Sequence, residues 1–428
     1  MTDAPPAPTR TSPPALGPAG RAPARGATYR EVFEDREMRV LLGTFLLRAL
    51  STTTEILGLS VLVLATTGSV FWSAVAYGVG FAPYLLGGSL LTSLADRLPA
   101  RALVVVSLLV RAVPGLLIGL LHLPVAAMLA LVFCVGAFDP VGTAATGRLT
   151  RTLLTGDRFV VGRSVLSAVG SVAQVAGLAL GGVLLLALSP RGLLLVSGLA
   201  LVLGALVARL GLRHHPVAHA PATGGAVRQT LRGNRRLLAD PRVRGLLLAQ
   251  WVPAWLVTGV EALVVGYVAH RGWPASGASL VLAAVPVGML VGDLLVGRAL
   301  RPWRREQLAF PLALLVGLPL VPWALGLPYA AVVGLGVACG LGFAYQVGLQ
   351  RRFAESLPEA DQGLGFGLLS SGLMGGQGLG PVAAGALAAT LGPAVAVTTM
   401  GAVAVVAVLA LRSTLRPDLA DQHPQGAR

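Results

Sequence analysis

Long apolar runs separated by short polar stretches make up most of the chain. A helix needs about 20 apolar residues to cross a bilayer. The connections alternate between very short turns, such as HLP at 122–124 and SPR at 189–191, and longer charged loops. The pattern predicts an all-α polytopic membrane protein. Its twelve transmembrane helices are expected at 40–65, 71–94, 102–121, 125–147, 161–188, 192–211, 244–269, 279–299, 308–327, 329–350, 362–390 and 393–411.

Composition supports a membrane protein and the charges predict its orientation. The chain is 55% hydrophobic and only 12% charged, whereas soluble domains carry about 25% charged residues. All 33 basic residues are arginines, and 29 of them lie on the side of the N-terminus, the even-numbered loops and the C-terminus, in these segments or in the helix ends beside them. Basic residues stay on the cytoplasmic side, so both termini are predicted to be cytoplasmic. The net charge of +15 does not indicate a nucleic-acid partner, because the arginines lie between apolar runs.

A long loop divides the predicted helices into two groups of six. The expected organisation is a disordered cytoplasmic tail at 1–35, a six-helix bundle at 36–211, a linker at 212–243, a second bundle at 244–412 and a tail at 413–428. Within the linker, Val227, Leu231 and Leu238 share one helical face beside several arginines. Two interpretations remain open for this segment: an amphipathic helix on an anionic membrane surface, or a solvated linker.

The two halves resemble each other in sequence. TTTEILGLSV at 52–61 pairs with TGVEALVVGY at 258–267, FCVGAF at 133–138 with ACGLGF at 338–343, and helix 5 with helix 11. All offsets fall between 203 and 206 residues, which places Glu55 opposite Glu261. Repeated halves that meet near the bilayer midplane are a transporter architecture.

At these residues the chain resembles the major facilitator superfamily. The family pattern between helices 2 and 3, G-x-L-A-D-R-x-G-R-R, is matched in part by TSLADRLPAR at 92–101. The resemblance implies gating roles for Asp96, Arg97 and Arg101, and Asp96 would cap a helix or pair with an arginine to lock one conformer. A solvated loop charge is the alternative for Asp96. Asp293, near the cytoplasmic end of helix 8, is interpreted as part of an inner gate.

A glycine-rich pattern, G-x-x-x-G-P-x-x-G-G, marks helix 5 of exporters in this family. Helix 5 reads AQVAGLALGG without the proline, and helix 11 carries a better copy, GQGLGPVAAG. Glycines four residues apart let helices approach closely. The residues predicted to pack helices in this way are Gly177, Gly181, Gly182, Gly376, Gly380, Pro381 and Gly385. The stretch from helix 3 to helix 5 resembles the branch of macrolide-efflux and enterobactin-exporter-like proteins.

Five charged residues inside the apolar runs are the candidates for coupling transport to protons or substrate. Charges within a bilayer are costly and usually functional. Glu55 and Glu261 are predicted to carry protons or bind a cationic substrate, and Arg48 shares a helix face with Glu55. The alternative for Glu55 is a fixed ion pair with Arg48 or Arg111. Asp139 is expected to pair with Arg111.

These features predict a proton-coupled exporter of a small amphipathic molecule, such as a drug, a macrolide-like metabolite or a siderophore, in the plasma membrane. An importer or uniporter with the same fold is the alternative. The chain lacks lysine and therefore a phosphate-binding G-x-x-x-x-G-K-[ST] loop, and it has no hydrolase or metalloprotease motif, so an enzyme is not expected. The expected partners are the substrate, protons and membrane lipids, with no cofactor or metal, and the chain is expected to be a monomer.

Overall fold

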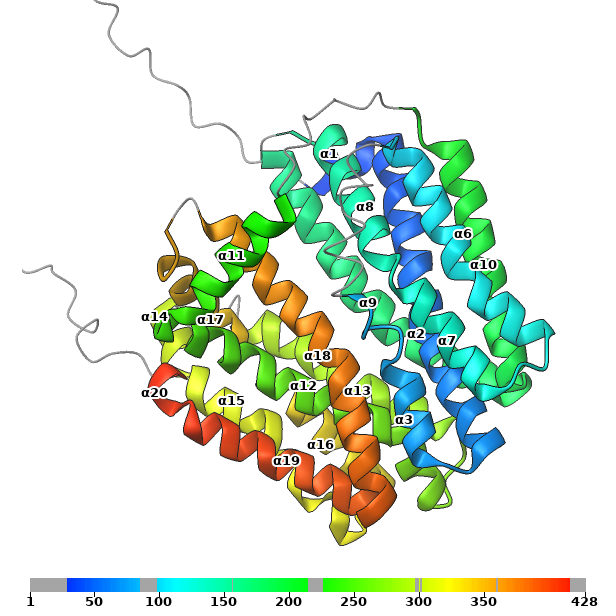
Figure 1. Cartoon of the computed structure of the whole chain (residues 1–428), viewed down its shortest axis with the longest axis vertical. Coiled ribbons are helices and arrows are strands. Elements are labelled where there is room, and N and C mark those ends of the chain that lie inside the picture. Colours follow the sequence, from blue (N-terminus) through cyan, green and yellow to red (C-terminus); the bar gives the residue numbers. More distant parts are fainter. Residues whose placement is uncertain are drawn as a thin grey trace, which may run out of the picture.

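The chain folds into two helical bundles (Figure 1). The structure, a computed structural model, describes residues 29–84, 98–155, 157–214, 226–296, 300, 302–358 and 361–415. Every regular element among these residues is a helix. This confirms the predicted all-α class.

The first bundle, called the N-half, begins with a short helix that precedes the first long one. Its elements are α1 (Tyr29–Glu34), α2 (Arg36–Thr67), α3 (Val70–Gly78), α6 (Ala100–Leu120), α7 (Val125–Gly136), α8 (Asp139–Leu153), α9 (Asp157–Ala187) and α10 (Pro190–Gly211).

The second bundle, called the C-half, repeats this order. Helix α11 (Ala226–Ala239) lies in the predicted linker and precedes the long helix α12 (Pro241–His270). The remaining elements are α13 (Gly277–Leu294), α14 (Pro302–Gln307), α15 (Ala309–Gly317), the 3₁₀ helix η2 (Leu318–Leu325), α16 (Tyr329–Gly342), α17 (Tyr345–Glu355), α18 (Gln362–Leu391), α19 (Pro393–Ala410) and α20 (Arg412–Leu415).

Nine helical stretches among the described residues are long and apolar enough to cross a membrane. The other three predicted spans also contain helices: α3, the shorter pair α15–η2, and α18, which is rich in glycine. The count of twelve spans stays a prediction. The nine are Arg36–Thr67, Ala100–Leu120, Val125–Leu153, Val161–Ala187, Pro190–Gly211, Pro241–His270, Gly277–Leu294, Tyr329–Glu355 and Pro393–Ala410.

The predicted fourth span is interrupted, because α7 ends at Gly136 and α8 begins at Asp139. Pro140 has no N–H to donate to the carbonyl four residues earlier, so a continuous helix would lose a hydrogen bond there. The chain tightens instead through bonds of the 3₁₀ type, from the Phe138 amide to the Val135 carbonyl at 2.9 Å and from the Val141 amide to the Phe138 carbonyl at 3.0 Å. The break places Asp139 in the first turn of α8, where the helix dipole favours a carboxylate.

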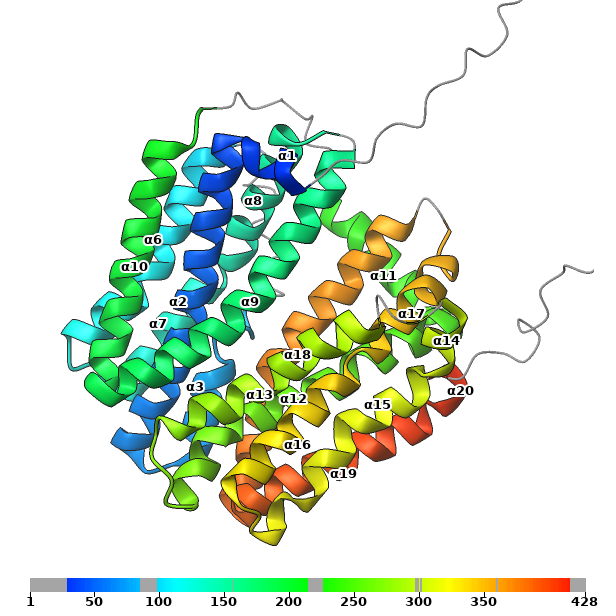
Figure 2. The same cartoon turned by 180° about the vertical axis from the view of Figure 1, so that it is seen from behind.

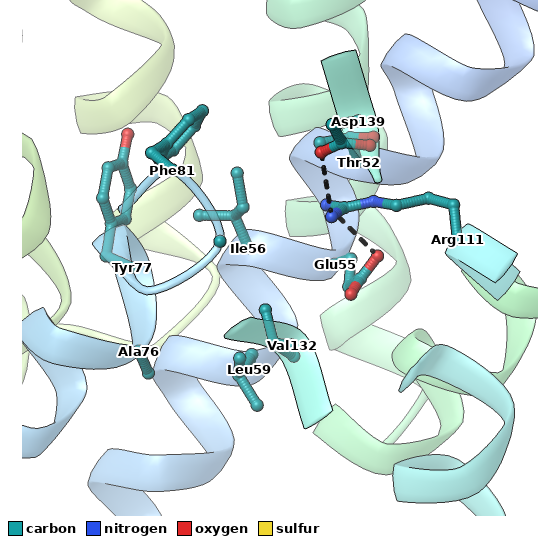
Figure 3. A pocket seen from close by; sticks show the side chains of 11 residues that line it. Thr52, Glu55, Ile56, Leu59, Ala76, Tyr77, Phe81, Arg111, Val132 and Asp139 are labelled. Atoms are coloured by element: carbon teal, nitrogen blue, oxygen red, sulfur yellow. Dashed lines mark hydrogen bonds and ion pairs between the residues drawn. The ribbon is translucent and has the colours of Figure 1, made fainter. Parts of the chain in front are cut away.

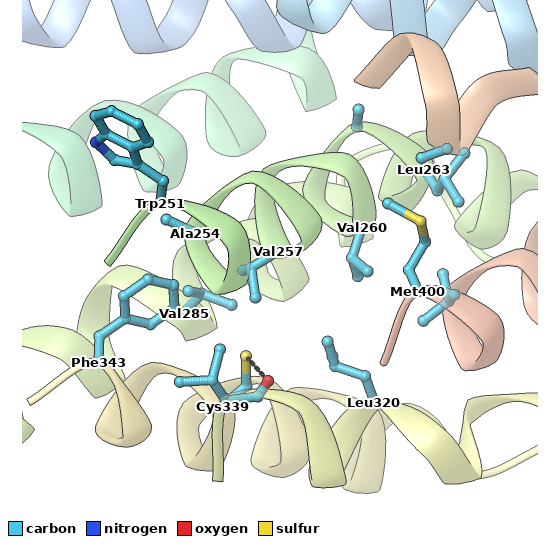
Figure 4. Packing of buried hydrophobic residues seen from close by; sticks show 14 of the residues in the cluster. Trp251, Ala254, Val257, Val260, Leu263, Val285, Leu320, Cys339, Phe343 and Met400 are labelled. Carbon is cyan, nitrogen blue, oxygen red and sulfur yellow. Dashed lines mark hydrogen bonds between the residues drawn. The ribbon is translucent and has the colours of Figure 1, made fainter. Parts of the chain in front are cut away.

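Helix α12 is buried along much of its length and carries the core of the C-half. Trp251, Val257, Val260 and Leu263 all belong to one large hydrophobic cluster (Figure 4). The predicted sequence repeat pairs α12 with α2, so the same central position is expected for α2 in the N-half. Its buried residues include Leu57, Leu59 and Val63.

The two halves contact each other through α3 with α18 and α12, and through α9 with α13. The contacts include Gly78 with Pro381, Gly385 with Ala74, and Gly182 with Ser279. These positions lie toward the end of the molecule that carries the α2–α3 and α12–α13 turns, which we call the distal side. On the terminal side, where α1 and α11 lie, the ribbons of the two halves diverge (Figures 1 and 2).

Candidate functional site

Four of the predicted coupling residues form one charge network in the N-half, in which Glu55 and Arg111 are buried and Arg48 and Asp139 are half-buried. The Arg111 guanidinium on α6 lies between two carboxylates, 3.6 Å from Glu55 Oε2 and 3.3 Å from Asp139 Oδ2. Asp139 Oδ1 is also 3.8 Å from Arg48 Nη1. The Glu55 side chain is 3% exposed and that of Arg111 is 5% exposed. Figure 3 shows Glu55 and Asp139 converging on the guanidinium.

Backbone spacing explains this order of charges. Arg48 and Glu55 are seven residues apart on α2, which corresponds to roughly 10 Å along the axis. The two side chains therefore share a face without meeting, and Asp139 and Arg111 complete the path between them. The pair of Arg111 with Asp139 agrees with the sequence prediction. Two cations and two anions leave the network neutral, as burial requires.

Glu55 is held by charge attraction rather than by hydrogen bonds. Within the described part of the chain, neither of its carboxylate oxygens has a hydrogen-bond partner. Its distance of 3.6 Å from Arg111 Nη2 is outside hydrogen-bond range. Arg111 by contrast donates a hydrogen bond to Asp139. Glu55 is thus the less tightly held of the two carboxylates.

A small cavity borders Glu55, Arg111 and Asp139. Its volume is about 30 Å³. That is room for roughly one or two water molecules and far below the several hundred Å³ of a drug-sized site. The remaining lining residues come from the N-half: Thr52, Ile56, Leu59, Ala76, Tyr77, Gly80, Phe81 and Val132.

Tyr77 connects this cavity to the second predicted carboxylate. Its ring lines the cavity, and its hydroxyl donates a hydrogen bond of 3.1 Å to Glu261 Oε2 on α12. The donor belongs to the N-half and the acceptor to the C-half. Glu55 and Glu261 therefore lie in different environments, one in an ion pair and the other in a hydrogen bond between halves.

Two of the four predicted gating residues, Arg101 and Asp293, belong to the part of the chain that the structure describes. Asp96 and Arg97 lie outside the described residues. Arg101 donates to the Arg209 carbonyl near the end of α10, so it satisfies a helix C-terminus. Asp293 is exposed near the end of α13. Their gating roles stay predictions.

The predicted glycine positions lie in close helix contacts. On α9, Gly177 and Gly181 face α2, and Gly182 faces Ser279 of α13 in the other half. On α18, Gly376 and Gly380 face α12, while Pro381 and Gly385 face α3. A Cβ on Gly380 would stand 2.2 Å from the Trp255 carbonyl oxygen.

Three aromatic side chains of the C-half hold its helices together. Trp251 and Trp255 stack on each other, and their indole N–H groups donate to the carbonyls of Leu369 and Gly372 on α18. Tyr345 is fully buried and donates to the Ala249 carbonyl. Glycines on α18 leave room for both indoles.

Sequence reasoning missed the apolar wall of the cavity. The available signal was a helical spacing around Glu55, since Thr52, Ile56 and Leu59 lie three or four residues apart on its face. No feature of the sequence predicts the hydrogen bond between Tyr77 and Glu261, because the two residues are 184 positions apart.

The sequence profile described as "Major Facilitator Superfamily" matches residues 40–351, which is most of the chain. The chain belongs to the major facilitator superfamily. It is therefore a multi-pass membrane protein and a secondary transporter rather than an enzyme. No curated protein matches the sequence significantly.

Solved transporters of this superfamily share the fold at low sequence identity. The nucleoside transporter NupG is 14% identical with a TM-score of 0.73, over 89% of this chain and 99% of its own. A bacterial homolog to the human lysosomal transporter Spinster, in an inward-facing and occupied conformation, is 15% identical with a TM-score of 0.73, over 94% of this chain and 100% of its own. These similarities establish the fold and leave the branch of the family unresolved.

Proposed function

We propose that this major facilitator protein is a proton-coupled exporter of a small amphipathic molecule that works by alternating access of its two halves. Glu55 is the proposed proton carrier. The observation that carries the proposal is the buried Glu55 carboxylate, which shares Arg111 with Asp139. Cytoplasmic termini, a plasma-membrane location and a monomeric state complete the proposal.

The shared arginine makes a change of charge at Glu55 tolerable. Removing one partner of an isolated buried ion pair leaves an uncompensated charge, which costs about 3–5 kcal/mol. Here a proton on Glu55 leaves Arg111 still paired with Asp139 at 3.3 Å. The network can therefore pass between two protonation states without stranding a buried cation.

We propose that the surroundings of Glu261 change when the two halves move apart. Its bond to Tyr77 exists only while α3 and α12 are close. Opening the distal side would break the bond and expose the carboxylate to a proton or to a cationic substrate. Glu55 and Glu261 would then act at different steps of the cycle.

An importer or uniporter remains the alternative within the family. The feature that favours it is the missing proline of the exporter pattern in helix 5, where Leu178 stands. A uniporter would need no proton carrier, so transport would survive the loss of Glu55.

The test is a susceptibility and accumulation panel in a bacterial host stripped of its own efflux pumps. The compounds are macrolides, dyes and siderophores. Wild type, Glu55→Gln, Glu34→Gln and empty vector are compared at equal expression. Glu34 is a suitable control because its carboxylate is 63% exposed, paired with Arg30 on the surface.

Lower accumulation with wild type and with Glu34→Gln, lost in Glu55→Gln, is the result expected for the exporter. Higher accumulation with wild type would reverse the direction. Wild-type transport by Glu55→Gln with an unchanged pH profile would remove Glu55 from the coupling mechanism.

A further inference from the structure

The internal repeat extends beyond the membrane-spanning helices into the short helices that precede them. Asp35 caps α2 by accepting from the Met38 amide, and Asp240 caps α12 by accepting from the Arg242 and Val243 amides. The offset between the two aspartates is 205 residues. By the same offset Val32 of α1 corresponds to Leu237 of α11, and both side chains are buried. Helices α1 and α11 are therefore equivalent parts of the two halves.

The starts of α9 and α18 are equivalent as well. A Cβ on Gly162 would stand 2.3 Å from a methyl group of Leu154, and a Cβ on Gly365 would stand 2.4 Å from a methyl group of Leu357. Both members of this contact repeat with an offset of 203 residues. Arg158 at the start of α9 therefore corresponds to Asp361 just before α18.

Each short helix is tied to its long neighbour by an ion pair, and the two pairs have opposite polarity. Glu31 of α1 accepts from Arg158 Nε at 3.0 Å, and we call this pair the N-corner. Arg236 of α11 pairs with Asp361, and we call this pair the C-corner. Equivalent positions thus hold opposite charges. Glu31 of α1 corresponds to Arg236 of α11, and Arg158 at the start of α9 corresponds to Asp361 just before α18.

The charged residues of the two short helices, taken together, differ in the same sense, with α1 acidic and α11 basic. Helix α1 contains Glu31 and Glu34 against one arginine. Helix α11 contains four arginines and no acidic residue. Both corners lie on the terminal side, where the ribbons diverge (Figures 1 and 2).

From these observations we infer that the N-corner and the C-corner are docking surfaces for each other, which meet when the halves close on the terminal side. Equivalent residues of two related halves approach one another on closure where they lie close to the pseudo-twofold axis, and the inference places the two corners there. Identical charges would then repel, whereas the reversed polarity lets Glu31 face Arg236 and Arg158 face Asp361. The inference rests on alternating access, and it is independent of substrate, coupling ion and direction.

Exposure of the ion pairs makes such an exchange of partners feasible. The side chains of Arg158 and Arg236 are 57% and 66% exposed, and those of their partners Glu31 and Asp361 are 34% and 19% exposed, so water reaches both pairs from the arginine side. Ion pairs that water can reach contribute little net stability. Breaking one pair within a half and forming another across the halves is therefore nearly balanced, as a reversible contact requires.

Charge-swapped variants test the inference. The N-swap, Glu31→Arg with Arg158→Glu, keeps a pair within the N-half but sets like charges across the halves. The C-swap, Arg236→Glu with Asp361→Arg, does the same from the other side. Combining both swaps restores opposite charges across the halves.

The measurement is the distance distribution between spin labels on Phe33→Cys and Leu231→Cys, both exposed, in lipid nanodiscs without substrate. Cys134 and Cys339 are first replaced. Each single swap should reduce the short-distance population by roughly threefold or more, and the combined variant should regain it. Additive losses in the combined variant, or no effect of either swap, would overturn the inference. A single unchanging distance in every variant would also overturn alternating access, so the two failures are distinguishable.

Discussion

Arg111 is the residue on which the candidate site depends. It is the cation shared by Glu55 and Asp139, and its side chain is almost fully buried. The sequence marked all three as charged residues in apolar runs and predicted the pair of Arg111 with Asp139. It left open whether Glu55 pairs with Arg48 or Arg111, because helix spacing alone does not say which side chain of a neighbouring helix comes within reach.

The shared cation leads to a prediction for stability. Arg111→Met leaves the buried Glu55 carboxylate without its cation, while Asp139 keeps only Arg48 at 3.8 Å, and should lower the free energy of unfolding by about 3–5 kcal/mol. Adding Glu55→Gln to this variant removes the stranded charge and should restore part of the loss. A double-mutant cycle from denaturation in detergent should give a coupling free energy above ~1 kcal/mol. A value near zero would contradict the ion pair.

Tyr77 supports a prediction about the distal side. Tyr77→Phe removes the hydrogen bond to the Glu261 carboxyl group, worth about 0.5–3 kcal/mol, and should favour opening of the distal side. Opening is measured by the rate at which an impermeant maleimide labels Ala76→Cys, a buried cavity position, after replacement of Cys134. The rate should rise several-fold.

The matched control for this experiment is Tyr329→Phe. Its hydroxyl donates to the Gly277 carbonyl within the C-half, so its loss should not alter labelling. Equal labelling rates in Tyr77→Phe and wild type would show that the Tyr77 bond does not hold the halves together.

At the scale of elements, apolar runs predicted the helices well and predicted their interruptions less well. The expected starts of α12 and α18 lie within three residues of those observed. Pro140 indicated a weak point in the fourth span. The equivalent break between α16 and α17 falls at Phe343 and Ala344. Because neither residue is a proline, the local sequence did not predict this break.

Glycines on α18 give a prediction that separates packing from helix propensity. Gly380→Ala would place a methyl group against the Trp255 carbonyl oxygen of α12, and overpacking of this kind costs about 1–3 kcal/mol. Gly367 on the same helix faces open space, so Gly367→Ala should raise stability by up to ~1 kcal/mol. Thermal unfolding of both variants in detergent provides the comparison. Equal destabilisation would mean that glycine serves α18 through flexibility rather than close packing.

At the scale of the whole molecule, the repeat in the sequence predicted two bundles of equivalent helices, and the superfamily assignment agrees with it. What the repeat could not provide was how the bundles face each other. The bond between Tyr77 and Glu261 depends on that arrangement, as do the reversed ion pairs of the N-corner and the C-corner. Such contacts exist in only one conformation of the transporter. The order of apolar and charged residues along the chain does not specify which conformation that is.

The contact between the halves yields the last prediction, a reversible lock. A Cβ on Gly385 of α18 would stand 3.0 Å from the Ala74 Cβ of α3, so a Gly385→Cys/Ala74→Cys pair needs only a small shift to form a disulfide. Oxidation should hold the distal side closed and stop transport of any panel compound that wild type moves, and reduction should restore it. Gly336→Cys/Ala284→Cys is the matched control, because its corresponding distance is 2.9 Å but both positions lie in the C-half. Oxidation of this control pair should leave the transport rate unchanged. Continued transport by the oxidised pair at Gly385 and Ala74 would mean that the halves do not separate at this contact, and alternating access through the distal side would have to be abandoned.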